Sequence, residues 1–231
     1  MKRGKRYGEL IKLIDRNRLY NLDEAADLLK QTANAKFDET IDLAARLGVD
    51  PRQADQNIRG TVSLPYGTGT SKRVLVFTTG EERIQEAEGA GADFVGGEDL
   101  VEQIQSGWME FDAAIATPDM MRVISRLGRI LGPAGLMPNP RSGTVTEDIG
   151  KTVNEIKAGR IEYRFERSAP IIHVPVGKVS FIKEQIKENI SIFMGEIVRL
   201  RPSSARGRYI RSIAVSSTMG PGIKLDPQQF G

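Results

Sequence analysis

Residues 73–96 read RVLVFTTGEERIQEAEGAGADFVG, and this stretch decides the fold class of the middle of the chain. Its β-branched run at 73–79, with an apolar centre at 74–77, is typical of a buried strand, and residues 81–88 and 93–96 are typical of a helix and a second strand. The alternation continues with a helix at 99–105, a strand at 111–117 and helices at 119–131 and 151–157. Strands that alternate with helices indicate βα units on a parallel sheet, so we expect residues 68–159 to form a compact α/β domain.

The two outer parts of the chain follow a different pattern. Asn21 precedes a helical run with Glu24 three residues on, as in a capping box. The outer parts carry expected helices at 8–16, at 22–31 and from about Ser180 onward, and expected strands at 40–49, 59–64, 161–167, 171–176 and 212–218. Because βα alternation is missing here, we expect residues 1–67 and 160–231 to form one discontinuous α+β domain, with chain crossings near Gly67 and Gly159.

Charge divides along the same boundaries. The chain has a formal net charge of +3, but residues 68–159 hold 9 Lys and Arg against 14 Asp and Glu, which leaves 24 against 16 for the rest. The middle is therefore acidic, at −5, and the outer part is basic, at +8. This division favours an outer domain that meets nucleic acid; ordinary solvated surface charge is the alternative.

Three glycine-containing stretches test whether the protein is a nucleotide-dependent enzyme. LPYGTGTSKR at 64–73 is followed by a strand, whereas a phosphate loop must open a helix, so we interpret it as an interdomain hinge. In RLGRILGPAGLMPNPRSGTV at 126–145 the helix comes before the glycines, and its prolines remove backbone donors, so we expect a structural loop. FTTGEERI at 77–84 has only Gly80 at the junction where a dinucleotide fingerprint would need several glycines. The enzyme hypothesis is thus the weaker alternative.

Other chemistry is poorly supported by the composition. The chain has no cysteine and a single histidine, so neither a catalytic residue nor a metal site is predicted, and no cofactor is expected. The longest apolar runs are too short to span a bilayer, and the first twenty residues lack the apolar core of a signal peptide. We therefore expect a cytoplasmic protein without a membrane partner.

Two outer stretches favour RNA. RLRPSSARGRYIR at 199–211 concentrates arginine with small hydroxyl residues, the side chains that contact phosphate. SSTMGPG at 216–222 places small residues, a hydroxyl and an apolar thioether where a nucleic-acid backbone could approach closely, although taken alone it is only a turn.

Six stretches, in chain order, resemble the bacterial-type ribosomal protein L1 family: KFDETIDLAARLGVDP at 36–51, TVSLPYGTG at 61–69, LGRILGPAGLMPNP at 127–140, KAGRIEYR at 157–164, HVPVGKVSF at 173–181 and STMGPG at 217–222. The resemblance extends from end to end of the chain. It implies a split α+β RNA-binding domain of ferredoxin/RRM-like fold, formed by both termini, and an inserted Rossmann-like three-layer α/β domain joined to it by two hinges.

The resemblance also implies a function without catalysis. The protein would be a structural constituent of the large ribosomal subunit and would bind large-subunit ribosomal RNA in the mobile stalk near the tRNA exit site. Its further partners would be exit-site tRNA, whose release after deacylation it would assist, and the mRNA of its own operon, whose translation it would repress. No small-molecule substrate is implied.

Carried over by motif, the RNA-binding residues would be Lys36, Phe37, Thr40, Glu166, Arg167, Ser168, His173, Ser212, Thr218, Met219 and Gly220. By the resemblance, Lys36 and Arg167 would neutralise phosphates. The hydroxyls of Thr40, Ser212 and Thr218 would form hydrogen bonds to phosphate or ribose. Phe37 would offer a flat apolar face; the alternative is that Phe37 and Met219 are core residues. The turn FERSAP at 165–170 is one residue longer than the family's usual turn.

Overall fold

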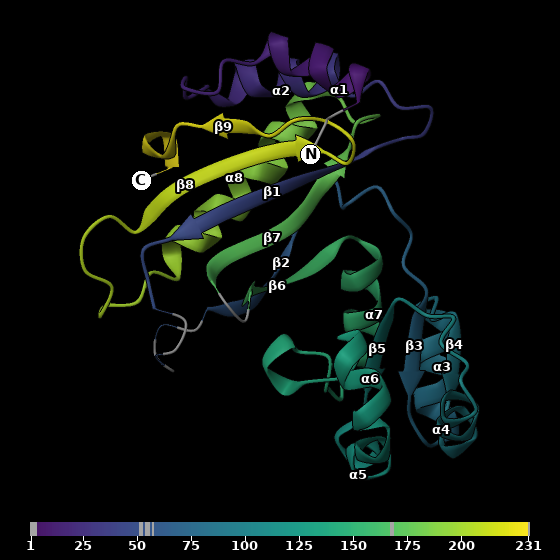
Figure 1. Cartoon of the computed structure of the whole chain (residues 1–231). Coiled ribbons are helices and arrows are strands. Elements are labelled where there is room, and N and C mark those ends of the chain that lie inside the picture. Colours follow the sequence, from purple (N-terminus) through teal and green to yellow (C-terminus); the bar gives the residue numbers. More distant parts are fainter. Residues whose placement is uncertain (1–3, 51–52, 54–55, 57, 167–168, 231) are drawn as a thin grey trace. The chain divides into compact units, whose positions relative to one another are not determined.

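The computed structural model describes residues 4–50, 53, 56, 58–166 and 169–230 (Figure 1). Its fold is mixed α/β, as the sequence predicts. The chain separates into two compact units, which we call unit 1 (Met1–Gly69 and Ile161–Gly231) and unit 2 (Thr70–Arg160). Unit 1 is therefore discontinuous in sequence, and the chain passes between the units twice.

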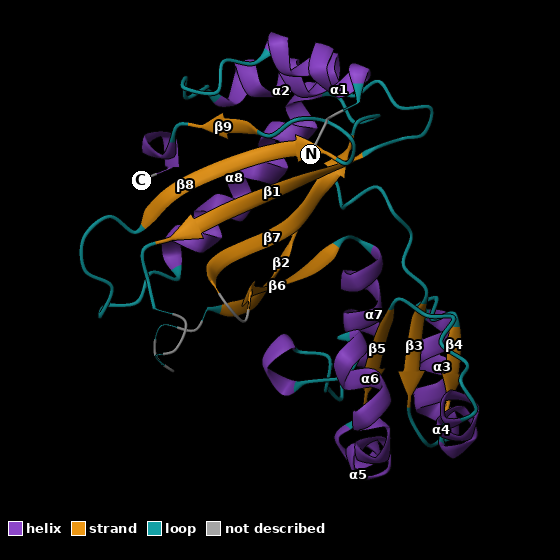
Figure 2. Ribbon diagram, viewed as in Figure 1, coloured by secondary structure: helices purple, strands orange, loops and turns teal. Residues whose placement is uncertain are grey.

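Unit 1 contains a six-stranded sheet (Figure 2). The strands run in the order β2 (Arg59–Ser63), β6 (Arg160–Glu166), β7 (Ala169–Lys178), β1 (Thr40–Leu47), β8 (Ile210–Ser217) and β9 (Ile223–Leu225). β1 is central and pairs antiparallel with both β7 and β8. Its period-two pattern sends Ile41, Leu43, Ala45 and Leu47 to the buried side and leaves the residues between them on the other side.

The helices of unit 1 cover one face of this sheet. They are α1 (Lys5–Leu10), the 3₁₀ turn η1 (Ile11–Leu13), α2 (Leu22–Thr32), α8 (Lys183–Arg199) and the 3₁₀ turn η5 (Pro227–Phe230). The predicted capping box is confirmed: Asn21 accepts from the Glu24 amide, and the Glu24 side chain accepts from the Asn21 amide. The apolar stripe of α8, which includes Ile186, Ile190 and Ile197, packs in one core with the buried side of the strands.

Unit 2 has three layers. Its parallel sheet has the order β4 (Phe94–Gly96), β3 (Val74–Phe77) and β5 (Ala113–Ala116). Val74 and Val76 pack on the side of α3 (Glu81–Gly89) and α7 (Ile149–Lys157). Leu75 and Phe77 pack on the opposite side, with α4 (Glu98–Gln105), α5 (Met121–Ile124) and α6 (Gly128–Ala134). A strand buried on both faces explains why residues 74–77 are continuously apolar rather than alternating.

The helix predicted at 119–131 is wrong in two respects. It is divided into η2 (Pro118–Met120), α5, η3 (Ser125–Leu127) and α6. At the change from α5 to η3 the Ser125 hydroxyl donates to the Arg122 carbonyl, which competes with the helical backbone pattern. The segment also ends later than predicted. Pro133 lies inside α6 without ending it, and the left-handed cap follows at Gly135, with φ of 75°.

Three smaller differences concern the outer elements. The helix expected at 8–16 is α1 followed by η1, so it begins and ends earlier. The strand expected at 171–176 is extended at both ends in β7, and the edge strand β9 was not predicted. β9 has three residues, too few for an alternating pattern to stand out, and it forms because Ile213–Val215 of β8 offers it a ladder.

Candidate nucleic-acid interface

One face of the unit 1 sheet carries no helix in the part of unit 1 that the structure describes. In the view of Figure 2, α8 lies behind the strands and this face is in front. We call it the open face and define it by the outward residues of the three central strands: Thr40, Asp42, Ala44 and Arg46 of β1, His173 and Pro175 of β7, and Ser212, Ala214 and Ser216 of β8. A broad sheet face left for solvent in a basic unit is a candidate surface for a polyanion.

At one end of this face the start of β1 is joined to the segment after β8. The Thr218 amide donates to the Thr40 carbonyl at 3.0 Å, and the Thr218 hydroxyl accepts from the Thr40 amide at 3.0 Å. The same hydroxyl lies 3.2 Å from the Thr40 carbonyl and can donate to it. Thr218 therefore has one acceptor lone pair left for a ligand, whereas its sequence motif suggested a free hydroxyl.

Two apolar side chains are exposed at this end. Phe37 is 54% exposed and Met219 is 49% exposed, so neither is a core residue. Lys36 is exposed beside Phe37, and the Thr40 hydroxyl accepts from the Lys178 ammonium at 2.8 Å. A Cβ on Gly220 would lie 2.4 Å from the Ser217 hydroxyl oxygen, which explains glycine at that position.

A buried carboxylate that sequence reasoning missed positions these segments. Glu39 is only 1% exposed, and it accepts from the amides of Ala35 (3.0 Å) and Met219 (2.9 Å). Burial alone would raise the pKa of Glu39, but these hydrogen bonds outweigh it and the pKa is lowered. Arg6, which was also missed, donates to the Met219 carbonyl at 3.1 Å. The contacts of Glu39 and Arg6 with Met219 have no local sequence signal, because these partners are far apart along the chain.

The remaining predicted site residues lie toward the other end of the open face. His173 is opposite Ala44, and its Nε2 lies 3.3 Å from Oε1 of Glu166. Ser212 is opposite Arg46. Ser212 and Thr218 are six residue steps apart along an extended segment, roughly 20 Å at the usual rise, so the predicted residues follow the face rather than forming one pocket. Arg167 and Ser168 lie outside the described residues.

A β-bulge makes this second end strongly basic. Arg46 pairs with Ser212 and Leu47 pairs with Ile210, which leaves Arg211 as the extra residue on β8. Arg211 and Ser212 are consequently both exposed, beside Arg46.

The loop before β8 adds two more exposed arginines, Arg206 and Arg208. Arg201 orders that loop by donating to the carbonyls of Ala205 and Gly207. A shallow hollow of about 530 Å³ lies here, lined by Gly48, Val49, Asp50, Gln53, Gln56, Ser204, Arg206 and Arg211. Arg208 lines a second hollow, with Val198 of α8 and Pro227 and Gln228 of η5. We call Arg46, Arg206, Arg208 and Arg211 the arginine end of unit 1.

The arginine end differs from the helix side of unit 1 in how its charges are satisfied. On the helix side, Lys183 and Lys187 form ion pairs with Asp27 and Asp23 at 2.6 and 2.5 Å. None of the four residues of the arginine end forms an ion pair with a described carboxylate. Uncompensated guanidinium groups at a surface are suited to phosphate oxygens.

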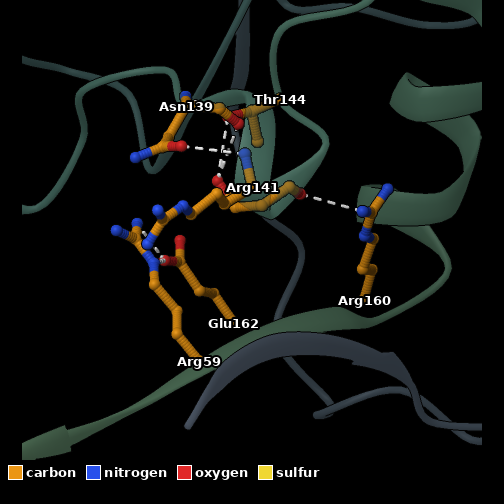
Figure 3. A network of polar contacts seen from close by, with 7 residues as sticks. Arg59, Asn139, Arg141, Thr144, Arg160 and Glu162 are labelled. Carbon is orange, nitrogen blue, oxygen red and sulfur yellow. Dashed lines mark hydrogen bonds and ion pairs between the residues drawn. The ribbon is translucent and has the colours of Figure 1, made fainter. Parts of the chain in front are cut away.

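Unit 2 shows that the glycine- and proline-rich loop at 132–144 is scaffold, as expected. Asn139 organises it: its side chain accepts from the Arg141 amide at 2.8 Å, and its own amide donates to the Thr144 hydroxyl at 2.8 Å (Figure 3). Arg160 then donates to the Ser142 carbonyl at 2.8 Å and to Glu155 at 2.7 Å. The backbone donors that a phosphate would need are used within the loop.

The junction between β3 and α3 also lacks the features of a phosphate site. Gly80 has φ of 96° and caps α3, but the first turn of that helix carries Glu81 and Glu82. Two carboxylates at the positive end of the helix satisfy its dipole and repel an anion. Among the residues that the structure describes, no three or more His, Asp or Glu side chains are grouped as a metal site, and no helix has the length and apolar character to cross a membrane.

Comparison with known protein families gives one match of direct relevance. The model of the family described as Ribosomal protein L1p/L10e matches residues 29–221. The match includes all of β1, β7 and β8, the strands that form the open face, and all of unit 2.

Proposed function

The chain belongs to the ribosomal protein L1p/L10e family, and from that premise we propose that it binds a structured region of large-subunit ribosomal RNA through the open face of unit 1. Membership of this family supports a structural role in the ribosome and binding to ribosomal RNA. Our proposal goes further in two respects: it names the residues that contact the RNA, and it adds exit-site tRNA and the protein's own mRNA as partners.

One observation carries the choice of this surface. The open face joins exposed apolar side chains at one end to arginines that pair with no described carboxylate at the other, and among the described elements helices cover only the opposite side of the sheet. Folded RNA presents unstacked bases together with a closely spaced phosphate backbone, and these two features require the two kinds of side chain. A protein-binding surface would not need such a concentration of arginine side chains.

The two ends would have different roles. At the first end, Phe37 and Met219 would pack on a base or ribose, while Lys36 and the hydroxyl of Thr40 would hold the adjacent backbone. Gly220 would allow that backbone to come close. Thr218 would act mainly by fixing Thr40, since most of its hydrogen-bonding capacity is already used.

At the arginine end, binding would be mainly electrostatic. Arg46 and Arg211 would contact phosphates beside the hydroxyl of Ser212, while His173 and Glu166 would lie along the path between the two ends. Arg167 and Ser168, from the adjoining turn, stay part of the proposed set. Phosphate contacts position the RNA and give little sequence preference, so specificity would come from the first end.

We extend the proposal to exit-site tRNA through unit 2. Although residues 70–160 hold 10 Lys and Arg against 14 Asp and Glu, Arg122, Arg126 and Arg129 recur at spacings of four and three residues along α5, η3 and α6. That spacing places them on one side of consecutive helical turns, and none forms an ion pair among the described residues. Unit 1 would hold the ribosomal RNA while unit 2 contacts tRNA. A mobile stalk that assists release of deacylated tRNA would need both contacts.

Repression of the protein's own mRNA would use the same open face. An mRNA segment that presents the same arrangement of unstacked bases and phosphates would compete with ribosomal RNA for it, so free protein would bind the message only when ribosomal RNA is saturated. The two RNAs should therefore displace each other in solution.

The test of the proposal separates the two units. A chain that joins residues 1–69 directly to 161–231 should keep most of the specific affinity for the stalk region of large-subunit ribosomal RNA, measured by filter binding, because the charge and the motifs both lie there. Circular dichroism would establish that this shortened chain is folded. Complete loss of binding by a folded shortened chain would contradict the assignment of the site to unit 1.

A further inference from the structure

A carboxylate lies in the middle of the open face, where a polyanion would be expected to meet only neutral or positive groups. Asp42 is an outward residue of β1, between the buried residues Ile41 and Leu43. Its neighbours across the two ladders are Pro175 of β7 and Ser216 of β8. It is partly buried, although no described helix covers this face of the sheet.

No described group donates a hydrogen bond to this carboxylate or forms an ion pair with it. The two basic side chains that act on Asp42 electrostatically are those of Lys178 and His173. Both have other partners: Lys178 donates to the Thr40 hydroxyl, and His173 lies beside Glu166. Burial raises the pKa of Asp42, and the charges of His173 and Lys178 lower it by less.

An unpartnered, partly desolvated carboxylate is unfavourable for the folded chain. Asparagine would fill the same space without a charge, so packing does not explain an aspartate at this position. Departures from the local rules of stability concentrate at functional sites, where a ligand supplies what the fold does not. The missing element here is a hydrogen-bond donor from outside the protein.

The chemistry of RNA limits which donor that can be. Phosphate offers only acceptors and a negative charge, so it is repelled. A ribose 2′-hydroxyl is a single donor. Adenine, uracil and cytosine each offer one donor group on the Watson–Crick edge. Guanine alone offers two parallel donors, N1–H and N2–H, which match the two oxygens of a carboxylate, and unpaired bases expose this edge.

We propose that Asp42 is the recognition group for an unpaired guanine of the bound RNA. The inference rests on the proposed function, because it takes the open face as the RNA site. Thr40 lies two residues before Asp42 on the same face of β1, and His173 is the next outward residue after Pro175 along β7 toward the arginine end. Asp42 thus occupies the stretch that joins the two ends, where it would add one base contact to the specificity that the first end supplies.

The test is the replacement Asp42→Asn in the full chain, measured against the stalk fragment of large-subunit ribosomal RNA. Asparagine keeps the shape but presents one acceptor where guanine needs two, so affinity should fall about tenfold. The dependence of affinity on salt should stay unchanged, because no phosphate contact is lost. The free protein should unfold at a higher temperature, because an unpartnered charge has been removed.

A control variant removes the same charge elsewhere. Glu184→Gln lies at the exposed start of α8, on the helix side of unit 1, and should leave affinity within about twofold of the original chain. If Asp42 merely repels the RNA backbone, Asp42→Asn will bind more tightly than the original chain, and an increase or no change in affinity would overturn the inference.

The guanine itself can be identified with RNA variants. Each unpaired guanine of the fragment is replaced in turn by inosine, which lacks the N2 amino group. One replacement should weaken the original chain several-fold and have little further effect on Asp42→Asn, which is the coupling expected for a direct contact. If every replacement acts equally on both proteins, the inference fails. Failure of the original chain to bind the fragment would instead refute the proposed function.

Discussion

Replacing Arg206, Arg208 and Arg211 together by glutamine should change how RNA binding depends on salt. All three side chains are exposed at the arginine end, and none forms an ion pair with a described carboxylate. Each phosphate that such a cation neutralises contributes about 0.7 to 0.9 to the slope of log affinity against log salt. Loss of three contacts should therefore reduce the magnitude of the slope by about 2 to 3.

This difference is large enough to measure. Raising the salt concentration from about 50 to 200 mM weakens RNA binding by both proteins. The factor by which the triple variant weakens should be about 20 to 40 times smaller than the factor for the original chain, as the change in slope requires. Filter-binding titrations at four or five salt concentrations, with the stalk fragment of large-subunit ribosomal RNA, give the slope directly. Thermal unfolding of the free protein should be almost unchanged, because exposed charges without partners contribute little to stability.

A matched control distinguishes local contacts from overall charge. Lys12, Arg16 and Lys30 are also exposed and carry the same total charge; they lie in η1, between η1 and α2, and in α2, on the helix side of unit 1. Their replacement by glutamine should change the slope by less than 1, on the scale of a single contact. Equal slopes for the two triple variants would refute the idea that the arginine end contacts phosphate.

Three further predictions concern how the site is held. Thr218→Val removes both hydroxyl contacts to the Thr40 backbone, so it should lower the free energy of unfolding by about 1 kcal/mol and weaken RNA binding without altering the salt slope; urea denaturation and filter binding measure the two effects. Gly48→Ala would place a Cβ 2.2 Å from the Arg208 carbonyl oxygen and should destabilise the chain by about 1–3 kcal/mol, seen as a lower urea midpoint, and an unchanged midpoint would contradict the close approach. Because the folded pKa of Glu39 is lowered from its ordinary value of 4.5, its contribution is present above pH 4.5 and is lost as the pH falls through the lowered value; Glu39→Gln should flatten this acid-side loss of stability in urea titrations between pH 5 and 2.

The sequence was sufficient for features that depend on neighbouring residues. The capping box at Asn21 and Glu24 and the alternation along β1 are local patterns, and both are present in the structure. The segment 118–134 was harder, because the Ser125 hydroxyl and Pro133 modify a helical pattern without abolishing it. The short strand β9 depends on an existing ladder and has no pattern of its own.

The candidate site was predictable as residue types but not as an arrangement. Phe37 and Met219 could have been core residues by composition, and only the folded chain exposes them. The hydrogen bonds between Thr218 and Thr40 and between Met219 and Glu39 each join residues about 180 positions apart, so no local pattern signals them. The bulge that exposes Arg211 depends on the register between β1 and β8.

The central claim is that this chain recognises large-subunit ribosomal RNA specifically, and not through charge alone. Its most direct test is a binding titration of the full chain against the stalk fragment of that RNA, with unrelated RNA of equal length as competitor. We predict saturable binding that survives about a thousandfold excess of the competitor, as specific complexes do. Displacement by the competitor at equal concentration would show that only backbone charge is recognised, and would contradict the account.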